Sequence, residues 1–130
     1  MSAEIVTLVR SAGGGVVCER CVVAGRPLRR MRGLLGRRSL PAGEGILLKP
    51  ARSVHTFFMR FPIDVVFVDS QLAVLSIAAA LPPWRTAAQR SAYSVLELAA
   101  GECERRRVAV GDVLLVRSRS VTAAGSSPPP

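Results

Sequence analysis

The sequence contains 130 residues, which fits one domain with a modest core, since single domains mostly run from about 100 to 200 residues. Its composition, 49% hydrophobic and 21% charged, is that of a globular protein and excludes a largely disordered chain. The formal charge of +9 comes from 18 basic and nine acidic residues, and every basic residue except Lys49 is arginine. Arginine-rich faces bind phosphate or carboxylate groups. Arginines spread along the whole chain are also typical of a high-GC genome, and we favour this compositional interpretation.

The cysteines indicate whether metal or redox chemistry is expected, and the N-terminal segment indicates the expected cellular location. Cys18 and Cys21 have CxxC spacing, but no second pair or histidine cluster completes a zinc site. Positions i and i+3 of a strand face opposite sides, so we expect ordinary packing of these thiols, with no metal and no cofactor. The N-terminus lacks the pattern of a signal peptide, and no apolar run approaches the ~20 residues that span a bilayer. We therefore expect a cytoplasmic protein without a transmembrane segment.

The first third of the chain predicts a hairpin followed by a helix. Residues 4–10 and 16–24 are rich in β-branched side chains, and the glycine-rich segment 11–15 between them supplies the turn. Pro27 then lies near the start of a predicted helix, in which leucine and methionine recur at intervals of three and four. The other face of this helix carries Arg26, Arg29, Arg30, Arg32, Arg37 and Arg38.

Short strands dominate the rest of the sequence. We predict strands at 46–48, 54–59, 63–68, 72–79, 93–99 and 113–117, an irregular loop at 82–90, and a short helical segment in ECERRR at 102–107. This gives a mainly β (α+β) domain of about seven or eight short strands, partly barrel-like, with one main helix and a short second helical turn. We place the domain at 1–118 and a dispensable, disordered Ser/Pro-rich tail at 119–130.

Three segments in order resemble the bacterial and archaeal family known as domain of unknown function 192. They are RPLRRMRGLLGRRSLPAGEGILL, HTFFMRFPIDVVFVDSQLAVLSI and YSVLELAAGECERRRVAVGDVLLV, which together span residues 26–116. The positions that match the family pattern are Gly33, Leu34, Leu40, Pro41, Gly45, Met59, Pro62, Asp64, Asp69, Leu96, Glu97, Gly101, Gly111 and Asp112. Family members often carry an export signal, absent here, and a glycine in the turn where this chain has Ser70 and Gln71. The resemblance implies a small, mainly β fold and no established activity.

Two stretches of the sequence contain the candidate binding residues. His55 is the only histidine, so general base catalysis near neutral pH would fall to it, and Trp84 is the only tryptophan, in a proline-rich loop. Aromatic residues on loops supply much of the contact energy at binding sites. The candidate binding residues are His55, Thr56, Phe58, Arg60, Asp64, Trp84 and Arg85.

A second set of residues is expected to support the fold. Asp64 lies in a strand that looks buried on both faces, so its carboxylate needs partners, either Arg60 or N–H groups freed by the bend at Pro62. We expect phenylalanines 57, 58 and 61 to fill the core around that bend. The predicted structural residues are Pro62, Asp64, Glu97, Gly101, Gly111 and Asp112.

The sequence is compatible with three functions. The sequence contains no Ser-His-Asp order, nucleotide-binding glycine loop or metal motif, so we assign no catalytic residue and favour a non-enzymatic domain that binds a small ligand, a glycan or a protein. One alternative is a hydrolase that uses His55 with Asp64 or Glu97. Another is nucleic-acid binding through the helix from Arg26 to Arg38.

Overall fold

The computed structural model describes residues 2–25 and 38–123. Within these ranges the chain forms nine strands and one short helix, and the predicted helix at 26–38 lies almost wholly outside them. The elements are β1 (Ser2–Arg10), β2 (Val16–Ala24), β3 (Glu44–Leu48), β4 (Ser53–His55), β5 (Ile63–Val68), β6 (Val74–Leu81), β7 (Thr86–Ala88), β8 (Ser94–Ala99), α2 (Glu102–Arg105) and β9 (Leu114–Ala123).

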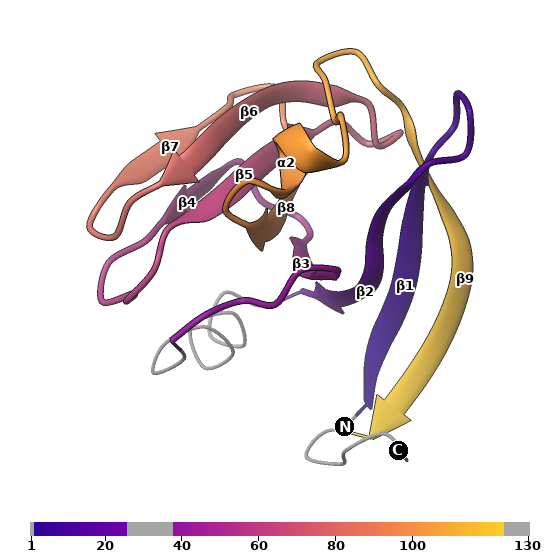
Figure 1. Ribbon diagram of the computed structural model, residues 1–130, viewed down its shortest axis with the longest axis horizontal. Helices are drawn as coiled ribbons and strands as arrows, with labels where there is room; N and C mark the ends of the chain where they lie inside the picture. The colour runs from indigo at the N-terminus through magenta and orange to yellow at the C-terminus, as the bar shows by residue number, and fades with distance from the viewer. Residues whose placement is uncertain (1, 26–37, 124–130) are drawn as a thin grey trace.

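Seven strands form one sheet in the order β6-β5-β8-β3-β2-β1-β9. Its neighbours are antiparallel except β2 and β3, which are parallel and need a long crossover between them. At one corner the edge strands meet, because Val74 donates to the Asp112 carbonyl and Leu114 to the Leu72 carbonyl. Figure 1 shows β6 and β9 diverging from this corner. The mainly β fold is therefore confirmed, as a curled sheet that does not close into a barrel.

A second sheet pairs β4 with β7, at the opposite end of the molecule from β1 and β9 (Figure 1). The predicted irregular loop at 82–90 thus contains a strand, since Thr86 pairs with His55 and Ala88 with Ser53. The predicted strand at 54–59 is shorter than expected, because it ends at His55 and Phe58 has a left-handed φ of 67°. Strand β7 has little β-propensity of its own and depends on its partner β4.

The core lies on both faces of the central strands. All six residues of β5 are buried, as its nearly continuous apolar sequence predicts. Ile63, Val65 and Phe67 enter one hydrophobic cluster, whereas Val66 and Val68 enter another. This alternation follows from the two-residue period of a strand, so Asp64 shares the face of Val66 and Val68.

A bulge in β2 brings two thiols together. Val6 pairs with Cys21 and Leu8 with Cys18, so three steps along β2 match two along β1. The extra residue turns Cys18 and Cys21 to the same face, where both are fully buried, and the expectation that they face opposite sides is wrong. A hydrogen bond with Cys18, together with burial, raises the pKa of Cys21 well above its ordinary value. Both side chains pack in the core.

The last strand is longer than the sequence indicated. It was expected to end at 117, with a tail from 119, but β9 continues to Ala123 along β1. Its final pairs run from Val6 with Arg119 to Ser2 with Ala123. Polar residues form this strand because it lies at an edge of the sheet and needs apolar side chains on one face at most.

The length of β9 can be tested by truncation. Ending the chain after Ser118 removes five residues that pair with β1, so we expect the melting temperature to fall by several degrees, at about 4–8 °C per kcal/mol for a small domain. Ending it after Ala123 keeps every pair and is the matched control. Equal melting temperatures of the two truncated proteins would contradict this role of residues 119–123.

Candidate functional site

The structure separates the residues that the sequence grouped between His55 and Asp64. Asp64 belongs to a buried polar network around α2, whereas His55, Thr56 and Phe58 lie beside the Trp84 loop. The two groups differ in exposure, since Asp64 is buried whereas Phe58 and Trp84 are exposed.

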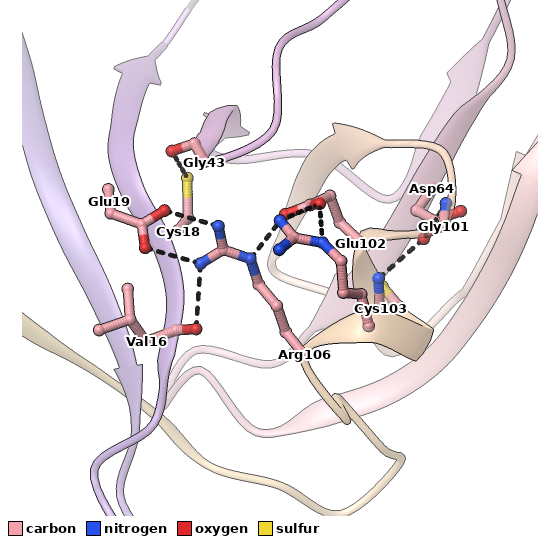
Figure 2. Close-up of polar contacts among 10 residues, drawn as sticks. Val16, Cys18, Glu19, Gly43, Asp64, Gly101, Glu102, Cys103 and Arg106 are labelled. Carbon is pink, nitrogen blue, oxygen red and sulfur yellow. Dashed lines mark hydrogen bonds and ion pairs between the residues drawn. The ribbon is translucent and has the colours of Figure 1, made fainter.

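Asp64 is almost fully buried and accepts three backbone hydrogen bonds. Its Oδ1 accepts the N–H of Ala80 at 2.8 Å, and its Oδ2 accepts those of Gly101 at 3.1 Å and Cys103 at 2.9 Å (Figure 2). Ala80 lies in a bulge of β6 opposite Asp64, where Ile63 pairs with Leu81 but Val65 with Ala78. The bulge leaves the N–H of Ala80 without a partner in the strand ladder, and the Asp64 carboxylate accepts its hydrogen bond.

The predicted structural role of Asp64 fits this geometry, but its partners differ from those expected. The donors come from β6 and the start of α2, far along the chain, and not from Arg60 or the bend at Pro62, both of which are exposed. Gly101 has a φ of 91°, so a residue without a side chain suits the turn that presents its N–H.

Replacing Asp64 with asparagine tests this role. The asparagine nitrogen cannot accept a hydrogen bond, so at least one buried N–H loses its acceptor and the free energy of unfolding should fall by about 1–3 kcal/mol. Urea unfolding of Asp64→Asn beside the parent measures the change. Asp69→Asn is the matched control, since a single oxygen of Asp69 accepts both the Gln71 and the Ala73 N–H groups and an amide oxygen can do the same. An unchanged midpoint for Asp64→Asn would refute the assignment.

Arg106 ties α2 to β2. Its Nε donates to Glu102 at 2.6 Å, and its two Nη atoms bind both oxygens of Glu19 at 2.9 and 2.6 Å (Figure 2). Nη1 also donates to the Val16 carbonyl, and Arg105 holds the other oxygen of Glu102. The spacing of Glu102 and Arg106 along the sequence was the available signal for the pair within α2. Nothing in the sequence indicated Glu19.

The Glu19 pair predicts a pH dependence of stability. The hydrogen bond from Arg106 lowers the pKa of Glu19 below its ordinary 4.5, so the stabilisation is present above that pH and is lost as the pH falls through the lowered value. Because the Glu19 side chain is half exposed, we expect less than about 1 kcal/mol. Urea midpoints of Glu19→Gln and the parent should differ at neutral pH and converge in acid. Glu104→Gln, in the same helix, is the control, and a difference independent of pH would contradict the prediction.

Cys103 is a buried thiol within this network. Burial, followed by the charge of Asp64, raises its pKa to about 12, so the thiol is neutral at physiological pH. Cys18 and Cys21 are also buried. In residues 2–25 and 38–123, no cluster of three His, Cys, Asp or Glu side chains is arranged to hold a metal ion.

Thr56 organises the second group. It is fully buried, and its Oγ1 donates to the Pro82 carbonyl at 2.6 Å and accepts the Arg85 N–H at 2.9 Å. Its backbone N–H donates to the Arg85 carbonyl, and its carbonyl accepts the N–H groups of Met59 and Trp84. One side chain and its peptide groups therefore lock the turn after β4 to the loop before β7.

Four rings form a continuous row on this frame, which we call the aromatic surface: His55, Phe57, Phe58 and Trp84. The ring centroids of His55 and Phe57 are 4.9 Å apart, those of Phe57 and Trp84 5.7 Å, and those of Phe58 and Trp84 4.6 Å. Phe57 is 37% exposed, Phe58 64% and Trp84 55%. Only Phe61, of the three phenylalanines expected in the core, is buried there.

The backbone under the aromatic surface is strained. Phe58 and Trp84 have φ values of 67° and 66°, a left-handed conformation that is uncommon outside glycine and costs about 1–3 kcal/mol per residue. The contacts of Thr56 hold both residues in it. Such strain persists mainly where surrounding structure enforces it, often at ligand-binding sites.

An open pocket of about 390 Å³ adjoins the row of rings. Residues of β4 and β7 line it together with His55 and Phe57. The Nδ1 atom of His55 accepts the N–H of Phe57 at 3.3 Å, which orients the imidazole at the edge of the pocket.

The other predicted residues lie apart from this surface or contribute to it only through the backbone. Glu97 is fully buried in β8, and Gly111 and Asp112 form the turn before β9, where Asp112 accepts the Ala109 N–H. Arg85 is exposed and donates to the Trp84 carbonyl at 3.3 Å. Of the arginines on the predicted helix, only Arg38 is within the described residues, and it is exposed.

Comparison with solved structures supports the fold. A protein named as a candidate transcription regulator from Sinorhizobium meliloti 1021 is similar with a TM-score of 0.74 and 24% identity, over 89% of this chain and 94% of that one. A protein of unknown function from Novosphingobium aromaticivorans DSM 12444 gives a TM-score of 0.72 and 24% identity, over 85% and 83%. A candidate exported protein from Burkholderia pseudomallei K96243 gives 0.52 and 18%, over 96% of this chain but 27% of that one.

Sequence comparison is more specific. No curated protein matches the chain. In the described residues, no helix is long and apolar enough to cross a membrane. The family model DUF192, described as "Uncharacterized ACR", matches residues 8–116. Since this match spans most of the chain and agrees with the motifs and the fold, the protein belongs to the domain of unknown function 192 family.

Proposed function

We propose that this protein is a non-catalytic binding domain and that the aromatic surface is its ligand-binding site. The observation that carries the proposal is the row of exposed rings, which is built on a backbone that Thr56 holds in a strained conformation. Single exposed apolar residues are common, but a contiguous exposed patch marks an interaction site far more often.

Rigid rings suit binding for energetic reasons. Aromatic side chains bury a large area on contact and lose little conformational entropy, because they rotate about only two bonds. The Thr56 contacts fix the two turns before any ligand arrives, so little ordering is required when it binds. Strain at Phe58 and Trp84 therefore contributes to a preformed site.

The hydrolase alternative has no observation in its favour. It requires a carboxylate that exchanges protons with His55, but Asp64 accepts three backbone N–H groups and Glu97 lies inside the sheet. Cys103 is a neutral thiol. A binding role uses the residues that are exposed and needs none of these.

A ligand screen with Phe58→Gly tests the proposal. Glycine accepts a φ of 67° without strain, so the turn keeps its shape and the melting temperature should not fall, while one ring of the site is removed. We expect thermal shift over metabolites, glycans and nucleic acids to find a ligand that stabilises the parent. Its affinity for Phe58→Gly should be roughly tenfold to a hundredfold weaker, as measured by quenching of the single tryptophan, Trp84.

Tyr93→Ala is the matched control for this experiment. Tyr93 is also an exposed aromatic residue, but it lies beyond the far end of the β4–β7 pair, where its carbonyl accepts the Ala51 N–H. Its removal should leave the affinity unchanged. A ligand that binds Phe58→Gly and the parent equally would place the binding site elsewhere.

A further inference from the structure

The charges around the aromatic surface indicate what it binds. Resting on the proposed function, we infer that its ligand is a single-stranded nucleic acid, with bases stacked on the rings and phosphates held by the surrounding cations. Three observations support this class of ligand: the distribution of charge, the exposure of the rings, and the small number of polar residues in the pocket.

The two segments that build the surface, residues 49–63 and 81–93, carry only positive formal charge apart from the one histidine. They contain no aspartate or glutamate, and all five of their cations are exposed. Arg60 and Arg85 lie next to Phe58 and Trp84 along the chain, whereas Lys49, Arg52 and Arg90 lie toward the other end of the β4–β7 pair. The ion pairs formed by Arg105, Arg106 and Arg119 lie elsewhere, with glutamates of α2, β2 and β1. A general bias toward arginine does not explain why these two segments lack carboxylates.

Exposed rings beside cations match the two parts of a nucleotide. Every base has a flat face that stacks on an aromatic side chain without regard to sequence, and arginine binds the phosphate as a two-pronged donor. Phe58 and Trp84 are the most exposed rings of the row, and the guanidinium of Arg85 lies beside the Trp84 carbonyl. Base stacking and phosphate binding therefore lie within one small surface.

Other ligands fit less well. Sugar hydroxyls need several acceptors, but only three of the residues that line the pocket are polar, Ser53, His55 and Thr86. An uncharged peptide has no anionic group for the exposed cations to bind. A duplex keeps its bases stacked inside, so the rings would not reach their faces. A flexible single strand presents both bases and phosphates to the surface.

The test measures binding of a dye-labelled oligo(dT) of about 16 nucleotides by fluorescence anisotropy across a range of salt concentrations. We expect the parent to bind and log K to fall linearly with log salt. Phe58→Gly should weaken binding about tenfold or more at every salt concentration with an unchanged slope. Arg60→Gln should make the slope shallower by about 0.7, the value of one phosphate contact on a single strand.

Two controls separate this inference from general attraction. Arg117→Gln removes the same charge from an exposed site on β9, and Tyr93→Ala removes an exposed ring outside the row; both should bind oligo(dT) like the parent. Two results would overturn the inference, because each would show that the attraction is only electrostatic. One is that Phe58→Gly binds oligo(dT) as well as the parent does. The other is that the parent binds a duplex of equal length as well as it binds the single strand. If oligo(dT) fails to bind while polygalacturonate binds and loses affinity in Phe58→Gly, the inference is wrong and the proposed binding site stands.

Discussion

The carboxylate of Asp64 is the interaction on which the rest of the fold depends. It lies in the most buried strand, yet its oxygens accept N–H groups from a bulge in β6 and from the first turn of α2. A buried charge is tolerated only when such bonds replace water. Because both donor segments are irregular, their N–H groups have no partner in the strand ladder, and that of the buried Cys103 would otherwise lack an acceptor. The Asp64 side chain thus supplies acceptors for the N–H groups of both segments and holds α2 against the sheet.

Two residues of the α2 region also contact the other half of the sheet. Arg106 reaches from the end of this helix to Glu19 on β2, and Cys103 packs in the same hydrophobic cluster as Cys18 and Cys21. The curled sheet is therefore held across its concave side by one buried carboxylate and one ion-paired guanidinium (Figure 2). The same network keeps the Glu102 carboxylate and the Cys103 thiol away from solvent, whereas Glu104 of the same helix is exposed.

Thr56 has a structural role at the surface that is similar to the role of Asp64 in the core. In both places one buried polar side chain serves the backbone of two segments that are distant in sequence. The result differs because the segments differ. Ile63 and Val65, which flank Asp64, are apolar and fully buried, whereas beside Thr56 the side chains of Phe58 and Trp84 are exposed, in turns with left-handed φ. The same kind of bonding therefore holds an exposed surface in one place and a buried core in the other.

The sequence by itself determined the elements that depend on local pattern. The bounds of β2 and β5 follow from runs of β-branched and apolar residues, and the family follows from the ordered motifs. Only the tertiary structure decided what depends on a neighbouring strand. The bulge that unites Cys18 with Cys21 is a mismatch of register between two strands, and β7 exists because β4 lies beside it. The donors to Asp64 are 16, 37 and 39 residues away, so no local pattern identifies them. The exposure of Phe58 follows from a left-handed turn that a remote loop enforces, which periodicity along the chain does not encode.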